Sequence, residues 1–199
     1  MKIGIMGGTF NPIHFGHLLL AEKACEQMGL NKVLFMPSKN PPHKPMPAEV
    51  SEQQRVDMIT LAIQDHPLFE LSTFELSRDG FTYTADTLTL LKQENPDIEY
   101  YFIVGTDSLF YMDQWKDPQI IFDLCTILVA GRDYANQEEI DQYIKYLNTK
   151  FGGTIQCIDM PMIEISSANI RERILKDCSV RNLMPSSVIQ YIEKQKLYT

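Results

Sequence analysis

The first seventeen residues, MKIGIMGGTFNPIHFGH, constrain the fold of this 199-residue chain more than any other stretch. Residues 2–6 are a short apolar run, which is typical of a central parallel strand covered on both faces. Gly7 and Gly8 follow, and adjacent glycines permit positive φ angles and a close approach of the backbone to a ligand. Residues 9–12 contain Thr, Asn and Pro, which favour a loop. We therefore predict a strand ending in a glycine turn that can hold a phosphate.

Two histidines follow this turn. His14 and His17 precede a run of good helix formers, so we predict a helix over residues 18–28 that stops at Gly29. Histidines three residues apart face the same side of a helix entrance, where free N–H groups and the helix dipole favour anions. Gly16 lies between them without a side chain, which lets a large group approach both imidazoles.

A zinc pair, or two surface histidines, is the alternative for this motif. Zinc needs one or two further ligands, whereas the remaining histidines are His43 and His66 and no cysteine pair has ligand spacing. The context therefore favours an anion site over a metal site.

The composition limits which classes of protein this chain can belong to. The chain is 44% hydrophobic and 22% charged, which fits one globular domain over residues 1–199. Its net charge of −8 argues against nucleic acid or an anionic membrane as a partner, so any phosphate site must be local. The four cysteines form no paired motif, and we see no signal peptide and no apolar run of transmembrane length. We expect a cytoplasmic protein with reduced thiols.

Strand and helix patterns alternate along the chain. We predict a doubly wound, Rossmann-like parallel sheet of five to six strands with helices on both faces and short C-terminal helices. The predicted strands after the first are 32–36, an edge strand within 69–76, 100–104, 125–130 and 155–158. The predicted helices after the first are 51–63, 84–94, 137–150 and two short helices between 179 and 198.

Two segments bring basic residues to the carboxyl ends of these strands. Residues 38–45 contain three prolines and form a stiff loop, whose Lys44 can meet a phosphate. A solvated loop without a binding role is the alternative. Arg132 follows the strand at 125–130 and is a candidate for binding a phosphate or a carboxylate.

Polar residues arrive at the same edge from other elements. Asp107 follows Gly105 just past a buried strand, where α/β proteins place a ribose or metal contact, although it can instead cap the next helix. Thr84 opens a helix, with capping by Thr84 or Asp86 as the simple interpretation. Trp115 is the only tryptophan and lies in a polar stretch, whereas a lone tryptophan usually belongs to the core.

A second motif, ISSANIR, covers residues 165–171. Consecutive serines start a helix and offer hydroxyls and free N–H groups, so Ser167 can contact a phosphate. Arg171 lies one turn later and can reach the same phosphate. Taken alone, the motif would be an ordinary helix cap.

Together these segments resemble the nucleotidylyltransferase superfamily, and within it the bacterial nicotinate-mononucleotide adenylyltransferases. GGTFNPIHFGH is similar to the superfamily signature, and NPPHK, YTADT, GTDS, ISSANIR and VRNLMPSSVIQYI extend the resemblance along the chain. Ala168 stands where the family more often has Thr, which removes one possible hydroxyl contact. The resemblance implies adenylyl transfer from ATP to nicotinate mononucleotide, with nicotinate adenine dinucleotide and pyrophosphate as products, as a step of NAD biosynthesis.

The resemblance also implies roles for individual residues. It assigns catalysis to His14, His17, Lys44 and Arg171. It assigns ATP binding to Gly7, Gly8, Thr9, Phe10, Gly16, Gly105, Asp107, Ser167 and Arg171. It assigns nicotinate mononucleotide binding to Asn11, Lys44, Thr84, Ala85, Trp115 and Arg132, with the carboxylate near Thr84 and the pyridine ring on Trp115. Mg²⁺ is expected to travel with ATP, and no separate protein metal site is implied.

Two other classes stay open. A sister transferase would act on pantetheine phosphate, glycerol phosphate or nicotinamide mononucleotide, and Trp115 and the Thr84 segment argue against it because they suit a flat acidic ring. A nucleotide-binding sensor without catalysis is the other class, and the presence of both histidines and Arg171 argues against it. The expected partners are ATP and nicotinate mononucleotide, with no nucleic acid and no membrane, and a homo-oligomer is left open.

Overall fold

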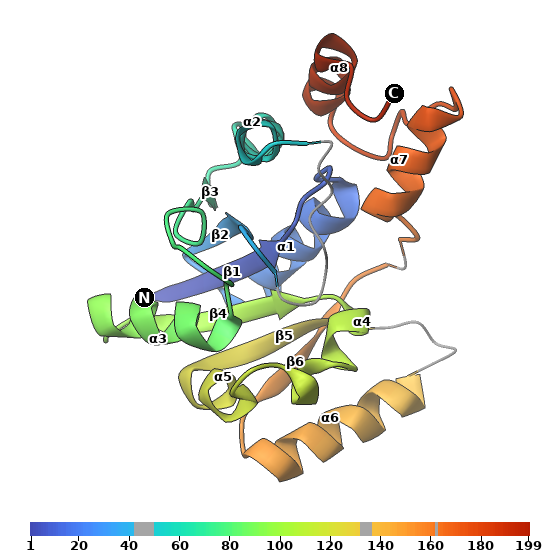
Figure 1. Cartoon of the computed structure of the whole chain (residues 1–199). Helices are drawn as coiled ribbons and strands as arrows, with labels where there is room; N and C mark the ends of the chain where they lie inside the picture. Colours follow the sequence, from blue (N-terminus) through green and yellow to red (C-terminus); the bar gives the residue numbers. More distant parts are fainter. Residues whose placement is uncertain (42–49, 132–136, 162) are drawn as a thin grey trace.

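A six-stranded sheet, parallel throughout, forms the centre of the fold (Figure 1). The strands are β1 (Lys2–Gly8), β2 (Lys32–Pro37), β3 (Phe69–Leu71), β4 (Glu99–Val104), β5 (Cys125–Gly131) and β6 (Ile155–Asp159). This computed structural model describes residues 1–41, 50–131, 137–161 and 163–199. The strand order β3-β2-β1-β4-β5-β6 confirms the predicted doubly wound sheet, with β3 at its edge.

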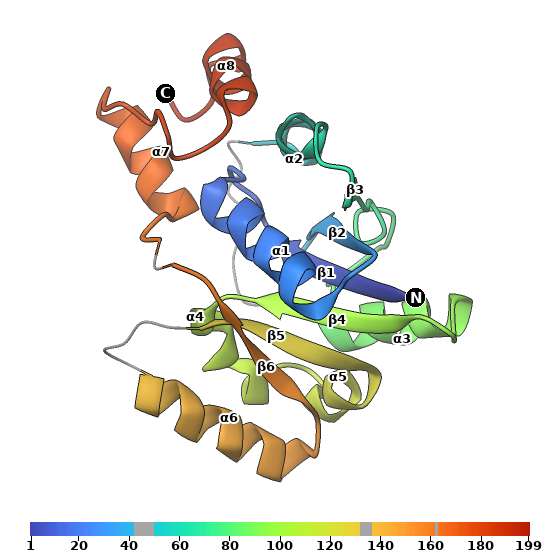
Figure 2. The same cartoon turned by 180° about the vertical axis from the view of Figure 1, so that it is seen from behind.

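Helices cover both faces of the sheet, as predicted (Figures 1 and 2). They are α1 (Phe15–Met28), α2 (Glu52–Ile63), α3 (Thr84–Glu94), α4 (Thr106–Leu109), η1 (Met112–Gln114), α5 (Pro118–Leu124), α6 (Gln137–Phe151), α7 (Ser167–Leu175) and α8 (Ser186–Gln195). One core joins α1, α2, α7 and α8 to one face, and a second joins α3, α4, α5 and α6 to the other. Strand β4 contributes to both cores. Tyr101 and Ile103 point into the first core, and Tyr100 and Phe102 point into the second.

The winding direction reverses between β1 and β4. From β1 the chain runs outward through β2 to the edge strand β3, and it then returns to the other side of β1 to build β4, β5 and β6. In an open parallel sheet, ligands bind in the crevice beyond the carboxyl ends of the strands at such a reversal. The ends of β1 and β4, at Gly8 and Val104, therefore mark the expected site.

The glycine pair does not form the predicted turn. Strand β1 continues through both residues, because Gly7 pairs with Met36 and Gly8 with Pro37 of β2. Neither glycine has a positive φ angle, whereas Phe10 does, at 48°. The turn therefore lies after the strand, within residues 9–12.

Helix α1 begins three residues earlier than predicted. It starts at Phe15 with His14 as the N-cap residue, because the N–H group of His17 already donates to the His14 carbonyl at 3.0 Å. Its end agrees with the prediction, since Gly29 has a left-handed conformation with φ of 61°. Both histidines therefore belong to the first turn of the helix.

Two other predictions were wrong. Residues 73–76 form a turn instead of the second half of an edge strand, and the Ser77 N–H group bonds back to the Thr73 carbonyl. Only one of the two expected C-terminal helices, α8, forms, because Asn182 has a left-handed φ of 65° that interrupts the segment before it. In the part of the chain that the structure describes, no helix is long and apolar enough to cross a membrane.

Candidate active site

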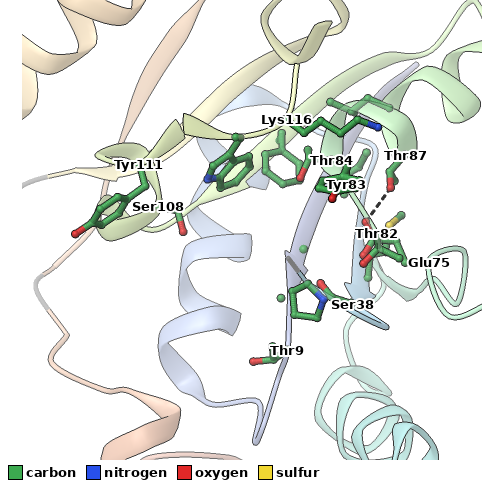
Figure 3. Close-up of a pocket in the computed structure, with 18 of the residues that line it drawn as sticks. Thr9, Ser38, Glu75, Thr82, Tyr83, Thr84, Thr87, Ser108, Tyr111 and Lys116 are labelled. Atoms are coloured by element: carbon green, nitrogen blue, oxygen red, sulfur yellow. Dashed lines mark hydrogen bonds between the residues drawn. The ribbon is translucent and has the colours of Figure 1, made fainter. Parts of the chain in front are cut away.

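A pocket of about 1050 Å³ opens beyond the carboxyl ends of β1, β2 and β4 (Figure 3). Its lining includes six residues for which the sequence predicts a binding role: Gly7, Gly8, Thr9, Thr84, Asp107 and Trp115. It also includes polar and aromatic residues that the sequence analysis missed, among them Glu75, Tyr83, Thr87, Tyr111 and Lys116. The pocket therefore lies at the reversal of the sheet, as the fold requires.

Gly7 and Gly8, together with Ile5, form the part of the wall contributed by β1. A Cβ atom added to Gly7 would lie 3.5 Å from the Phe102 ring, and one added to Gly8 would lie 3.4 Å from the Phe10 ring. These are close to ordinary contact distances, so packing within the protein does not by itself demand glycine. The pair instead keeps the β1 backbone accessible from the pocket.

Helix α3 begins in the wall of the pocket. Its N-cap residue, Tyr83, makes no side-chain capping bond, and the N–H groups of Thr84 to Asp86 have no partner within the helix. Thr84 lines the pocket, whereas Ala85 is fully buried, so only its backbone can contribute to binding. The start of α3 therefore offers N–H donors and the positive end of a helix dipole to an anion.

The acidic residue at this helix start, Asp86, is neutralised by its neighbours. The Lys116 Nζ atom lies 3.0 and 3.2 Å from the two carboxylate oxygens of Asp86, and 4.6 Å from the centre of the Tyr83 ring. The hydrogen bond to Asp86 raises the pKa of Lys116, and Arg78 adds a second cation 4.0 Å from Asp86. These two cations thus offset the charge of Asp86 beside Thr84.

Trp115 and Asp107 complete the far side of the pocket. Trp115 is half-buried and meets the Phe102 ring edge to face, with 6.1 Å between the ring centres. Asp107 is exposed in the first turn of α4, and its carboxylate caps no amide of that helix. Trp115 is thus placed for ring stacking, and Asp107, an acidic residue near the positive end of α4, stays open to both a ligand contact and a role at the helix start.

The two predicted histidines form a stacked pair at the start of α1. Their ring centres are 3.7 Å apart with 28° between the planes, and the Phe10 ring meets His17 edge to face at 5.1 Å. The backbone N–H group of His14 donates to Nδ1 of His17 at 3.3 Å. Because Nδ1 accepts this bond, a neutral His17 carries its proton on Nε2 and can donate it to a ligand oxygen.

Both histidines are neutral at pH 7 in the protein without ligand. Burial lowers the pKa of His14 to about 4, and His14 is only 6% exposed. Burial also lowers the pKa of His17 well below its ordinary value, and the adjacent His14 adds to this effect because two stacked cations repel. A bound anion would reverse both effects, since a neighbouring negative charge favours the protonated ring.

We predict that the buried histidines make the protein less stable at acidic pH. The unfolded chain binds a proton at His14 near pH 6.5, whereas the folded protein binds it only near pH 4. The stability is therefore full above pH 6.5 and is lost as the pH falls towards 4, by about 3 kcal/mol from His14 alone. Urea unfolding of the wild type and His14→Ala between pH 7.5 and 4.5 tests this. Parallel stability curves for the two proteins would contradict it.

Gly16 packs tightly against the His14 ring. A Cβ atom at this position would lie 3.0 Å from Nδ1 and 3.1 Å from Cε1 of His14, closer than normal contact. The sequence alone predicts that Gly16 leaves access for a substrate. The structure gives a nearer reason, because the His14 ring occupies the space that a side chain would fill.

The turn of residues 9–12 is held by donors from distant parts of the chain. Buried Arg55 of α2 donates from Nη1 to the Thr9 carbonyl at 3.0 Å. From α7, Arg171 Nη1 donates to the Asn11 carbonyl at 2.7 Å, and the Ser167 hydroxyl donates to the Pro12 carbonyl at 2.8 Å. Ser166, rather than Ser167, caps α7. The two motifs therefore meet, as expected, although Ser167 and Arg171 also bind the turn itself.

Several predicted contacts lie elsewhere or outside the described residues. The Phe10 side chain is 1% exposed and belongs to the core, so only its backbone can meet a ligand. The Asn11 side chain is also buried, and its Oδ1 accepts a hydrogen bond from the Tyr198 hydroxyl. Gly105 is the N-cap residue of α4, beside the pocket but not in its lining. Lys44 and Arg132 fall outside the described residues.

Residues 5–173 match the cytidylyltransferase-like family. A protein of Lachnoclostridium phytofermentans named a probable nicotinate-nucleotide adenylyltransferase is 47% identical over 99% of this chain and 98% of its own length. A protein of the same name from Synechococcus sp. strain JA-3-3Ab is 41% identical over 99% of this chain and 94% of its own.

The fold is also that of a solved structure, the nicotinic acid mononucleotide adenylyltransferase of Plasmodium falciparum in complex with NaAD. It superposes with a TM-score of 0.80 at 21% identity and covers 99% of this chain and 97% of the other. At that identity the likeness concerns the fold alone, whereas the relatives above match in sequence along the whole chain. The sheet reversal, the histidine pair and the sequence matches together show that this chain belongs to the nicotinate-nucleotide adenylyltransferases of the cytidylyltransferase-like family.

Proposed function

We propose that this protein transfers the adenylyl group of ATP to nicotinate mononucleotide and so produces nicotinate adenine dinucleotide and pyrophosphate for NAD biosynthesis. The observation that carries the proposal lies at the sheet reversal, where a helix start bearing two histidines accompanies a pocket lined by Trp115 and the start of α3. The names of the relatives and the NaAD bound to the Plasmodium protein support it.

We assign the ATP phosphates to the histidine side of the site. His14, His17 and Arg171 supply donors there, together with the backbone around Gly7 to Phe10 and the hydroxyl of Ser167. Asp107 takes the ribose of ATP at the end of β4. Within the described residues, Nη1 is the one guanidinium nitrogen of Arg171 with a protein acceptor, so Nε and Nη2 remain for phosphate.

We assign nicotinate mononucleotide to the side of the 1050 Å³ pocket that Trp115 and the start of α3 line, and ATP to the side that Asp107 and residues 7–9 line. The ring stacks on Trp115, its carboxylate meets the N–H groups at the start of α3, and Lys116 adds a positive charge nearby. Lys44 and Arg132 are proposed contacts of its phosphate from outside the described residues. Asn11 contributes through its backbone, because its Oδ1 is bonded to Tyr198.

The chemistry requires positioning and charge neutralisation more than a protein nucleophile. An oxygen of the mononucleotide 5′-phosphate attacks the α-phosphorus of ATP, a new P–O bond forms, and the bond to the bridging oxygen of the β-phosphate breaks as pyrophosphate leaves. The attacking group is already an anion, so no strong base is needed. His17 Nε2–H, His14 and Arg171 stabilise charge on the transferring phosphate. ATP enters as its Mg²⁺ complex, with the metal on phosphate oxygens and water.

The state of the cysteines fits the expected cytoplasmic location. Burial raises the pKa of Cys25 to about 11 and that of Cys125 to about 12, so both thiols stay protonated at neutral pH. In the described residues the cysteines form no disulfide, which is typical of a reducing compartment, and we propose that the reaction takes place there.

We predict that Arg171→Lys raises the KM for ATP by about tenfold and that for nicotinate mononucleotide by less than twofold. A planar fork that bonds both Asn11 and a phosphate is replaced by a point charge that cannot serve both. Steady-state kinetics with each substrate varied in turn measure the two constants. If only the mononucleotide KM rises, the two phosphate sites are assigned the wrong way round.

The function itself is tested by pyrophosphate release from ATP with different acceptors. We expect release with nicotinate mononucleotide, much slower release with nicotinamide mononucleotide, and none with pantetheine phosphate or glycerol phosphate. Rapid release with one of the last two acceptors would identify a sister transferase. No release with any acceptor, combined with tight ATP binding, would identify a nucleotide sensor.

A further inference from the structure

A buried carboxylate in the pocket wall has no role in the proposed reaction. Glu75 lies in the turn between β3 and α3, is 7% exposed and lines the pocket (Figure 3). Burial raises the pKa of this carboxyl group, and hydrogen bonds from neighbouring hydroxyls, Thr87 foremost, offset part of the effect. A carboxylate is costly to bury, so its partners indicate what it does.

The principal partner is Thr87, one turn into α3. The Thr87 hydroxyl lies 2.9 Å from Oε1 of Glu75 and 2.8 Å from Nη1 of Arg78. A guanidinium group only donates hydrogen bonds, so Thr87 must accept from Arg78 and donate its own proton to Glu75. The direction of both bonds is therefore fixed, and Glu75 holds the hydroxyl in one orientation.

The chain of contacts continues around the start of the helix. Arg78 Nη2 lies 4.0 Å from Asp86, and Asp86 is bonded to Lys116 at 3.0 Å. Lys116 in turn lies over the ring of Tyr83, the N-cap residue. Glu75, Thr87, Arg78, Asp86 and Lys116, which we call the α3 brace, thus tie the turn after β3 and the segment after η1 to the first turn of α3.

We propose that Glu75 and Arg78, acting through Thr87, are positioning residues that fix the first turn of α3 for recognition of the carboxylate-bearing ring of the acceptor. The inference rests on the proposed function, because it concerns the same pocket. In this role Glu75, Arg78 and Thr87 need not contact the transferring phosphate. Their loss should therefore weaken binding of the acceptor and its acid specificity, with little change in the use of ATP.

The decisive variant is Thr87→Val, which keeps the shape of the side chain and removes the hydroxyl. We expect the KM for nicotinate mononucleotide to rise by about tenfold, while the KM for ATP and kcat change by less than about twofold. The preference for nicotinate over nicotinamide mononucleotide should fall by about the same tenfold. Thr87→Ser keeps the hydroxyl and should restore values within about twofold of the wild type.

Thr89→Val is a matched control on the same helix. The Thr89 hydroxyl donates to the Ala85 carbonyl at 2.8 Å, and Thr89 does not line the pocket. This variant also removes one hydroxyl and one hydrogen bond from α3, but it leaves the α3 brace intact. It should leave both KM values and the acid preference unchanged.

The outcomes separate this inference from the proposed function. A wild-type protein that fails to use nicotinate mononucleotide overturns the proposed function. A wild type that does use it, with Thr87→Val equal to wild type or with both KM values raised alike, overturns the positioning role alone. If Thr87→Val does not fold, Arg78→Met in the turn before α3 provides the same comparison, with a rise of about fivefold expected in the mononucleotide KM only.

Discussion

His17→Ala is expected to lower the turnover number by about 100-fold or more and to leave ATP affinity nearly unchanged. The imidazole contributes a donor on Nε2 whose bond strengthens as charge develops on the transferring phosphate, and such a donor is worth about 3 kcal/mol in the transition state. Rapid-quench kinetics give the turnover number, and titration calorimetry with ATP gives the affinity. A wild-type turnover number in the variant would exclude the catalytic role.

The structure supplies a control and a second variant for this test. His66 pairs with Glu22 and stacks on Phe69, away from the pocket lining, so His66→Ala should keep wild-type turnover. His14→Ala should lose turnover as His17→Ala does and also lose some ATP affinity. Its ring stacks on His17, and its removal also takes away the support of that ring.

The second large effect is the choice of acceptor. We expect nicotinate mononucleotide to exceed nicotinamide mononucleotide in kcat/KM by about 100-fold or more. The start of α3 offers N–H donors, which pair with a carboxylate but oppose the NH₂ group of an amide, and such a mismatch costs several kcal/mol. Asp86 would favour the amide if its charge were uncompensated, but Lys116 and Arg78 compensate it.

Two variants separate stacking from specificity. Trp115→Ala should raise the KM of both mononucleotides by similar factors, because stacking does not distinguish the two rings. Lys116→Met should lower the preference for the acid, because it removes one of the two cations beside Asp86. Equal kcat/KM values for the two mononucleotides in the wild type would show that the acid-specific assignment is wrong, even if adenylyl transfer is right.

The fold and the histidine pair were predictable because local periodicity decides them. Buried runs such as residues 100–104 became strands, and the spacing of His14 and His17 placed both rings on one face of a helix start. Helix geometry fixes that relation over three residues, whatever the rest of the chain does. Gly29 likewise ends α1 for a local reason, because glycine readily adopts the left-handed conformation at a helix end.

Residues whose roles depend on distant partners were not predictable. The alternating pattern of residues 73–76 predicted a strand, but Glu75 turns inward to accept from Thr87, twelve residues later. Asn11 was expected at the ligand, whereas its side chain is bonded to Tyr198 near the other end of the described chain. Arg55 lies on α2 and is fully buried behind the turn, where it donates to the Thr9 carbonyl. A local pattern cannot reveal such pairings.

The support of the 9–12 turn has a consequence for the order in which the protein becomes active during synthesis. The residues of the turn are made before the residues that donate to its carbonyls, which are Arg55, Ser167 and Arg171. Strand β1 likewise receives its second neighbour, β4, only after residue 99 has been made. For most of its synthesis, a nascent chain therefore contains His14 and His17 without the contacts from β4 and α7 that support the strand and turn before them. ATP binding should therefore begin only after α7 has emerged and docked.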